Sequence, residues 1–294
     1  MSGVALAAAS GIGFGVFQSL NVRAVRGLDP FVSTFLQVAV AAVILAAASV
    51  ATQDLSRVGD APAWALADFA AAGLLHFLAG WTFLNLSQRR IGAARTSPLL
   101  TTTPLFGLVV AAVTVGQLPG PLGLAAVALM VAGAAVVARA RGGAAVRPRD
   151  AAFGLLCALC WALSPVLTVH GLRGLDSPLL GLTIGLAVSV AAYALAFAVW
   201  RGGLGLGGTS RATLRLKLVA GVLVGLSTWG RWAALDDAAV GIVLALNLLS
   251  VPIVLVGAPL VAGGQLEHVT AAIWLGAGLV VGGSLVLIAA GGGR

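Results

Sequence analysis

Charged residues are scarce in this sequence, since only 9% of its 294 residues are Asp, Glu, Lys or Arg while 60% are hydrophobic. A soluble domain carries about 25% charged residues. Together with a mean hydropathy of +1.07, this composition excludes an ordinary water-soluble fold. The chain is therefore expected to reside in lipid.

Cysteine is also scarce, and Cys157 and Cys160 lie inside one apolar block. Neither has the neighbouring His, Cys or charge that metal or redox chemistry needs, so we interpret both as small buried side chains. HExxH, P-loop and GxSxG motifs are missing as well. We expect no enzymatic activity, no metal, no cofactor and no ATP-driven step.

The formal net charge of +8 does not indicate nucleic-acid binding, because the arginines lie in short gaps between apolar blocks. The positive-inside rule and anionic lipid headgroups explain that distribution better. We therefore expect membrane lipid and a small-molecule substrate as partners, and no nucleic acid.

About 20 apolar residues are needed to cross a bilayer as a helix. Helices are also the spanning form that satisfies its own backbone in lipid. Ten blocks of suitable length predict an all-α membrane protein with ten transmembrane helices: 3–21, 31–51, 64–86, 92–115, 121–138, 152–170, 178–200, 215–235, 239–262 and 270–290.

The two halves of the chain resemble each other. Residues 26–29, Arg-Gly-Leu-Asp, recur as residues 173–176, a shift of 147. Trp81, Thr102, Pro104 and Gln117 align at a shift of 148 with Trp229, Ser250, Pro252 and Gln265. An internal duplication is the simplest explanation. We predict a first five-helix repeat (1–138), a basic cytoplasmic linker (139–150) and a second five-helix repeat (151–294).

Basic residues also predict the orientation of the chain. The odd-numbered gaps hold thirteen of the 17 basic residues, namely Arg23, Arg26, Arg89, Arg90, Arg95, Arg139, Arg141, Arg147, Arg149, Arg201, Arg211, Arg215 and Lys217. Those gaps should face the cytoplasm, with both termini outside. Because five is odd, the second repeat is inverted relative to the first, an arrangement typical of secondary transporters.

Aromatic residues in the first helix of each half (Phe14, Trp161) and Pro-bearing helices around Pro104 and Pro252 complete this pattern. Across nearly its whole length the chain resembles the EamA-type permeases of the drug/metabolite transporter superfamily, which includes bacterial amino-acid and metabolite exporters. The resemblance implies that helices 1–4 and 6–9 surround a central cavity, while helices 5 and 10 are peripheral.

Polar side chains within the apolar blocks indicate where such a cavity lies, because they are costly in lipid. Phe14 and Gln18 share one face of the first block, and Trp161 and Ser164 share the corresponding face of the sixth. An aromatic ring beside a polar strip suits a small amphiphilic substrate. The alternative is that these groups only hydrogen-bond between helices.

Six further residues complete the predicted cavity set: Gln37, His76, Trp81, Trp229, Arg231 and Asn247. The two amides cannot satisfy themselves within a helix. The histidine either binds substrate, couples transport to protons or bonds between helices. Arg231 either meets a substrate carboxylate or pairs with Asp236 or Asp237 near the interface. The two tryptophans line the cavity or belong to an aromatic belt.

We therefore predict a secondary transporter of the bacterial plasma (inner) membrane that moves a small amphiphilic, amino acid-like metabolite by alternating access, with export as the expected direction. A membrane scaffold or an intramembrane enzyme is the alternative. Spacings of small residues, such as Gly278 and Gly282, could serve a dimer contact, so we expect a monomer or a weak homodimer.

Overall fold

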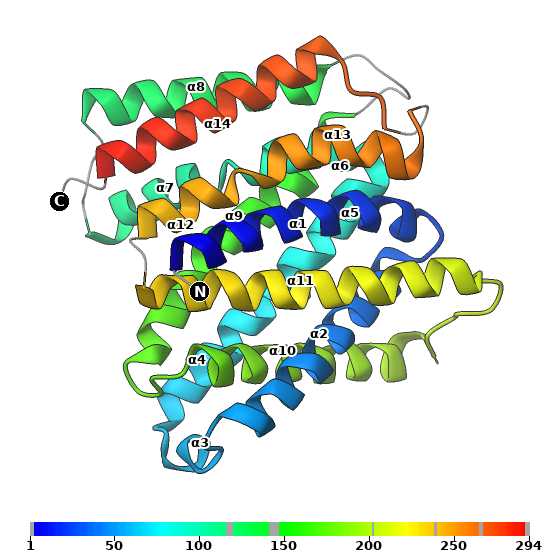
Figure 1. Ribbon diagram of the computed structural model, residues 1–294, viewed down its shortest axis with the longest axis vertical. Helices are drawn as coiled ribbons and strands as arrows, with labels where there is room; N and C mark the ends of the chain where they lie inside the picture. Colours follow the sequence, from blue (N-terminus) through cyan, green and yellow to red (C-terminus); the bar gives the residue numbers. More distant parts are fainter. Residues whose placement is uncertain are drawn as a thin grey trace.

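The computed structural model describes residues 3–115, 120–140, 147–201, 203–237, 240–264 and 267–291. Every regular element in these ranges is helical, which confirms the all-α prediction (Figure 1). The first half contains α1 (Gly3–Arg26), α2 (Pro30–Thr52), α3 (Ser56–Asp60), α4 (Ala63–Gly73), η1 (Leu74–Gly80), α5 (Trp81–Ile91), α6 (Ala93–Leu100), α7 (Thr103–Val115) and α8 (Pro121–Arg139). The second contains α9 (Pro148–Leu172), α10 (Pro178–Ala196), η2 (Phe197–Arg201), α11 (Arg211–Asp237), α12 (Val240–Asn247), α13 (Ser250–Ala262) and α14 (Ala271–Gly291).

Eight helices in the described part are long and apolar enough to cross a membrane. They correspond to the predicted blocks except 92–115 and 239–262, which are both interrupted. Their prolines, Pro104 and Pro252, lack the backbone N–H, and a proline ring clashes with the carbonyl four residues earlier. Those carbonyls belong to Leu100 and Leu248, where the helical ladder breaks. The ten-span, two-repeat arrangement therefore stays a prediction.

Helix starts follow local sequence. Asp29 caps α2 by accepting hydrogen bonds from the backbone N–H groups of Phe31 and Val32, at 3.0 and 3.3 Å. Ser177 caps α10 in the same way through the N–H of Leu180. A proline follows each cap at the first helical position, where its missing N–H costs nothing.

The first long helix of each half packs against the other half. α1 contacts α11 and α13, and α9 contacts α4 and α6. α2 packs against α10, and α8 packs against α14 at the upper edge of the molecule, as expected for peripheral helices (Figure 1). Both chain ends are drawn on the left of that view. Helices from both halves therefore enclose the centre.

Glycine sets the closest of these approaches. A Cβ on Gly133 of α8 would lie 2.6 Å from the carbonyl oxygen of Gly276 on α14. Gly278 and Gly282, the predicted small-residue contact, have no neighbour within 4 Å of a built Cβ. They therefore make no close contact with the described residues, and the dimer contact stays a prediction.

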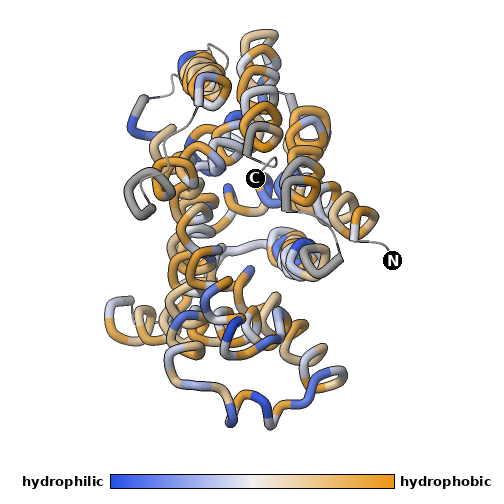
Figure 2. Tube along the Cα trace, turned by 90° about the vertical axis from the view of Figure 1, so that its left-hand side faces the viewer, coloured by the Kyte–Doolittle hydropathy of each residue, from blue (hydrophilic) through white to orange (hydrophobic). Residues whose placement is uncertain are grey.

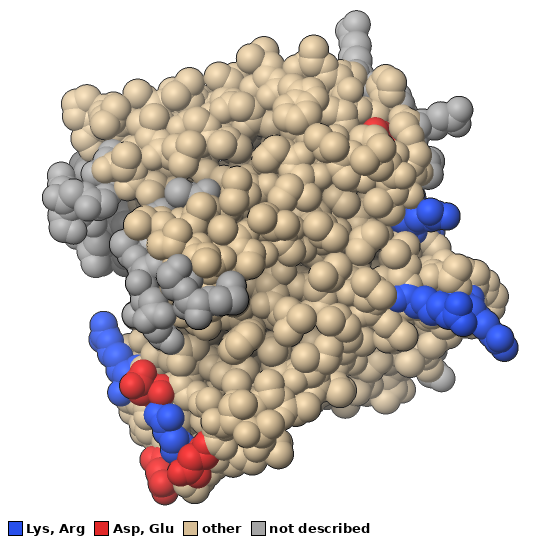
Figure 3. All heavy atoms as spheres, in the orientation of Figure 1, with Lys and Arg blue, Asp and Glu red and all other residues tan. Residues whose placement is uncertain are grey.

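Apolar residues dominate the helices along their length (Figure 2), and charged side chains gather at two ends of the molecule (Figure 3). Basic groups project at the right of Figure 3, where α1 ends and α11 begins, and acidic groups lie together with basic ones near α3 at the lower left. The wide uncharged band between them fits a protein surrounded by lipid. Residues 141–146 of the predicted linker, together with Gln117 and Gln265, lie outside the described residues.

Candidate functional site

A cavity of about 400 Å³ lies between α1, η1, α9, α11 and the two interrupted helices. That volume is in the range of small-molecule sites. Its wall is largely apolar but includes seven of the predicted site residues: Phe14, Gln18, His76, Trp161, Ser164, Arg231 and Asn247. The side chains that were predicted from two separate helical faces therefore meet in one space.

His76 lies on the π-helical segment η1, a distortion that is often found at functional sites. Its Nδ1 is 2.8 Å from the hydroxyl oxygen of Ser164, and its ring stacks on Trp161 with centroids 5.4 Å apart. The Trp161 indole N–H donates to the carbonyl oxygen of His76 at 3.4 Å. Phe14 meets the same indole edge-on at 5.6 Å. Together these groups form a polar-edged aromatic wall.

Arg231 reaches the cavity from α11 and also lines a small adjoining recess of about 10 Å³, together with residues of this wall and with Trp81 and Asn247. Among the described residues no side chain forms a hydrogen bond or ion pair with it. The side chains of Asp236 and Asp237, its predicted interfacial partners, lie outside the described residues. A guanidinium in a cavity suits a carboxylate.

The two interrupted helices border the same cavity. Leu100, Thr101 and Thr103 line it at one break, and Leu248 and Ser250 line it at the other. The hydroxyls of Thr101 and Ser250 donate to carbonyls three residues earlier, at 2.7 and 2.8 Å. As expected for hydroxyls beside broken helical ladders, they satisfy local backbone groups.

Two predicted cavity residues lie elsewhere. Trp229 is 37% exposed on the outer surface and does not line the cavity. Gln37 is buried but belongs to a second polar cluster with Lys217. Trp81 is 1% exposed and touches only the small recess, so the two repeat-equivalent tryptophans occupy different environments.

The placement of Lys217 in a basic cytoplasmic gap was wrong. α11 begins at Arg211, so Lys217 is already inside the helix, and it is only 1% exposed. Its ammonium donates to three side-chain amide oxygens, those of Asn21, Gln37 and Asn85, at 2.6, 2.8 and 3.3 Å. The apolar residues that follow it in the sequence were a signal that it belongs to the helix.

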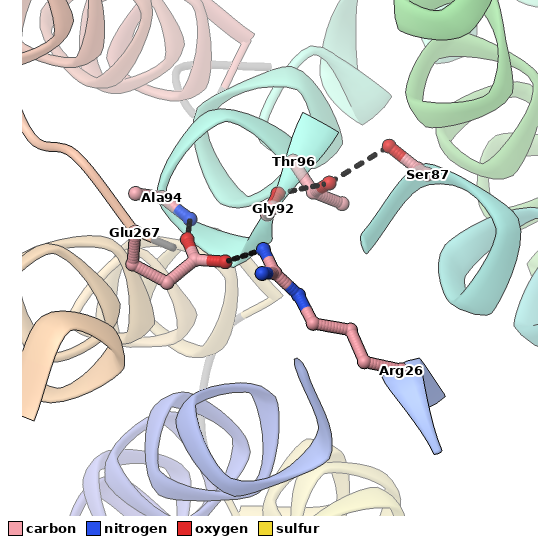
Figure 4. Close-up of polar contacts among 6 residues, drawn as sticks. All are labelled: Arg26, Ser87, Gly92, Ala94, Thr96 and Glu267. Carbon is pink, nitrogen blue, oxygen red and sulfur yellow. Dashed lines mark hydrogen bonds and ion pairs between the residues drawn. The ribbon is translucent and has the colours of Figure 1, made fainter. Parts of the chain in front are cut away.

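At the basic end of the molecule a second unpredicted cluster joins the two halves (Figure 4). Glu267, 2% exposed, accepts from the N–H of Ala94 at 3.1 Å and pairs with Arg26 at 3.1 Å. Burial, the largest influence, raises the pKa of this carboxyl above its usual value, while the Ala94 N–H and Arg26 oppose the shift. The cluster therefore links α1, α6 and the loop before α14 at this end.

The Glu267 carboxylate packs closely against the backbone turn at Gly92. Gly92 has a φ of 81°, and a Cβ there would lie 2.6 Å from both carboxylate oxygens. On the other side of the turn the Thr96 hydroxyl donates to the Gly92 carbonyl at 2.7 Å and lies 2.8 Å from the Ser87 hydroxyl (Figure 4). These bonds tie α5 to α6 next to the ion pair.

Cys157 and Cys160 are free and buried, as predicted. Within the described residues no group of three or more His, Cys, Asp or Glu side chains could hold a metal.

Comparison with known proteins supports the fold and the family. A crystal structure described only as "Crystal structure of protein" superimposes with a TM-score of 0.62 at 19% identity, covering 95% of both chains. At that identity the likeness shows the fold alone. No curated protein sequence matches the chain. The model of the EamA-like transporter family matches residues 1–139, so the first half of the chain is similar to that family, in keeping with the apolar helices that are long enough to span a membrane.

Proposed function

We propose that the protein is a secondary transporter that moves a small amphiphilic metabolite by alternating access through the cavity between its two halves. The observation that carries this proposal is the cavity itself. It combines an aromatic wall at Trp161 with Arg231, an arginine to which no described residue bonds. A scaffold would not need such a space.

The proposed transporter has ten spans in two inverted five-helix repeats. α6 with α7 forms the fourth span and α12 with α13 forms the ninth, each broken at repeat-equivalent residues. Transporters commonly bind substrate where such discontinuous helices meet near the midplane. α1 packs against α11 and α13 of the second half, and α9 packs against α4 and α6 of the first half. These reciprocal contacts support the same symmetry. We place the basic end in the cytoplasm of a bacterial inner membrane, with both termini outside.

The substrate chemistry follows from the wall of the cavity. Trp161 and Phe14 offer flat apolar surfaces for a ring or a hydrocarbon part. Arg231 supplies a cation for a carboxylate, and Asn247 and Ser164 supply hydrogen bonds nearby. An amino acid-like or aromatic carboxylate fits this set.

The Arg26–Glu267 pair suggests how access from the basic side is controlled. In the proposed mechanism this ion pair helps to hold the two halves together at the basic side. Leu172 and Pro178, at the end of α9 and the start of α10, line the cavity toward the opposite side. Transport then requires the pair to open when the opposite side closes.

Binding is tested first, by a thermal-shift screen of the purified protein against amino acids, aromatic carboxylates, nucleosides, sugars and amphiphilic amines. A ligand that binds the folded state raises its apparent stability. The strongest ligand, radiolabelled, is then used for counterflow in proteoliposomes with and without a pH gradient. Flux driven by the substrate gradient, by exchange or by protons is expected, and an absolute requirement for ATP would contradict the proposal.

The site is tested in the same assay with a combined variant, Phe14→Leu, Gln18→Leu, Trp161→Leu and Ser164→Ala. Counterflow should be lost while the protein remains monodisperse in detergent. Trp229→Leu is the matched control, because this tryptophan does not line the cavity, and it should retain wild-type counterflow. Unchanged counterflow in the combined variant would move the site elsewhere or favour a non-transporting role.

A further inference from the structure

The side-chain amides of Asn21, Gln37 and Asn85, which we call the amide cage, are all oriented in one way around Lys217. An ammonium has three protons and no lone pair, so each of its partners must present an acceptor. Asn21, Gln37 and Asn85 therefore turn their oxygens toward Lys217. The Gln37 side-chain nitrogen has no partner among the described residues, and the Gln37 oxygen accepts from both Lys217 and Asn85 Nδ2, at 2.8 and 3.3 Å, so the orientation of that amide is set through its oxygen.

A line of amides carries this orientation to the cavity. Asn21 Nδ2 donates to Gln88 Oε1 at 2.7 Å, and Gln88 Nε2 donates to Gln18 Oε1 at 3.5 Å. Gln18 Nε2 in turn donates to the Ser97 hydroxyl oxygen, also at 3.5 Å. Along this line each amide accepts on the side of the lysine and donates to the next group toward the cavity, while Asn21 Nδ2 also donates to Asn85 Oδ1 at 2.9 Å. Gln18 and Ser97 both line the cavity, so the line ends there with hydrogen-bond donors.

The last two bonds are long, which leaves the Gln18 amide loosely held. Bonds of 3.5 Å are at the limit of useful geometry. A better acceptor that enters the cavity would shorten the contact and strengthen it. The Ser97 hydroxyl can donate to the same ligand.

The described groups that bond to Lys217 are all neutral. α1, α2, α5 and α10 contain no Asp or Glu, and the two acids of α11, Asp236 and Asp237, come about five turns later. An unpaired cation inside a membrane protein is costly and marks a functional site. Neutral amide oxygens solvate the charge without cancelling it, so its field extends toward the cavity.

We propose that Lys217 is a positioning residue that makes the inner end of the cavity a subsite for an anionic group, with the Gln18 amide N–H and the Ser97 hydroxyl as the contacting donors. The subsite admits carboxylates and rejects ammonium groups, so cationic amines are excluded as substrates. The inference rests on the proposed function for the existence of a substrate, but the local potential can be measured without transport.

The test uses an introduced thiol as a probe of charge. Ser97→Cys is placed in a background with Cys157→Ala and Cys160→Ala, and the detergent-purified protein is treated with two thiosulfonate reagents of similar size. One carries a sulfonate and the other a quaternary ammonium. The ratio of their reaction rates, divided by the ratio for a free thiol in solution, reports the potential at position 97. We expect the corrected ratio to exceed one.

Lys217→Gln removes the charge while its amide can still bond within the cage. The corrected ratio should fall about tenfold, as expected for loss of one nearby unit charge in a poorly screened site. Lys217→Arg keeps the charge and should restore the ratio. Val169→Cys at the exposed mouth of the cavity is the control, where Lys217→Gln should change the ratio much less.

A corrected ratio at or below one in the protein that retains Lys217 would overturn the proposal, even if the variants at that position fail to fold. A ratio that Lys217→Gln leaves unchanged would also overturn it. The same holds if the Ser97→Cys protein reacts with neither reagent while the Val169→Cys protein reacts with both. None of these outcomes depends on transport. If the wild-type protein shows no counterflow, while the corrected ratio at position 97 still exceeds one and falls in Lys217→Gln, the result would contradict the proposed function alone.

Discussion

Gly92→Ala should destabilise the protein, because Gly92 has an unusual backbone conformation and lies against the Glu267 carboxylate. Gly92 has φ 81° and ψ 165°, a region that only glycine adopts readily. Holding alanine there costs roughly 1–3 kcal/mol. The new Cβ would also lie 2.6 Å from both Glu267 oxygens and displace the carboxylate. The bonds of that carboxylate to Ala94 and Arg26 would then weaken, and hydrogen bonds to a charged group contribute about 1.5–3 kcal/mol each.

The total cost of strain and weakened bonds is smaller than the sum of these values, because the Arg26 side chain is 27% exposed and keeps part of its hydration. We expect Gly92→Ala to lower the free energy of unfolding by about 3–5 kcal/mol. Gly263→Ala is the matched control, since Gly263 has a φ of 89° and, among the described residues, no atom within 4 Å of a built Cβ. It should cost only the backbone strain, about 1–3 kcal/mol.

Unfolding by SDS in mixed micelles, followed by circular dichroism, measures both variants. In a Glu267→Ala background the displaced group is gone, and Gly92→Ala should cost no more than Gly263→Ala. Equal costs for the two glycine substitutions in the presence of Glu267 would refute the explanation, because the carboxylate contact would then contribute nothing.

Three further expectations follow from the packing and charge. Burial raises the pKa of Glu267, so the cost of its charge is relieved as pH falls through that raised pKa toward the ordinary 4.5. Thermal scans should therefore show the wild type gaining stability relative to Glu267→Gln over this pH range. Parallel pH profiles of the two proteins would contradict this expectation. Trp81→Ala should cost about 3–5 kcal/mol because the ring is 1% exposed, whereas Trp229→Ala should cost less, about 1–2 kcal/mol, because Trp229 is 37% exposed. Similar unfolding midpoints for the two variants would count against this packing. Gly73→Ala would place a Cβ 2.2 Å from the backbone oxygen of Gly185, so α4 and α10 must separate at a cost of about 1–3 kcal/mol, and an unchanged SDS midpoint would exclude the close approach.

The helical fold was predictable because hydropathy is local. Runs of about 20 apolar residues and the backbone's need for hydrogen bonds in lipid are properties of each segment alone. The same holds for Phe14 with Gln18 and Trp161 with Ser164, whose spacing places each pair on one helical face. The structure brings these two faces to one cavity.

Lys217 shows where local reasoning ends. A basic residue near the end of an apolar block has the same sequence signature whether it points to lipid headgroups or into the protein. Only the arrival of Asn21, Gln37 and Asn85 from three other helices decides between them. The buried place of Glu267 likewise depends on the turn at Gly92, far away in sequence.

The sequence by itself determined that this protein resides in lipid, that it is helical, and on which helical faces its aromatic and polar residues lie. These properties depend on composition and on spacing along one helix, and not on contacts with other helices. The tertiary structure alone decided which of those faces meet. It buried Trp81 and left Trp229 exposed, although the two are repeat-equivalent. The physical reason is that the rotation of a helix about its axis is set by contacts with neighbouring helices, and those contacts join residues that are distant in the chain.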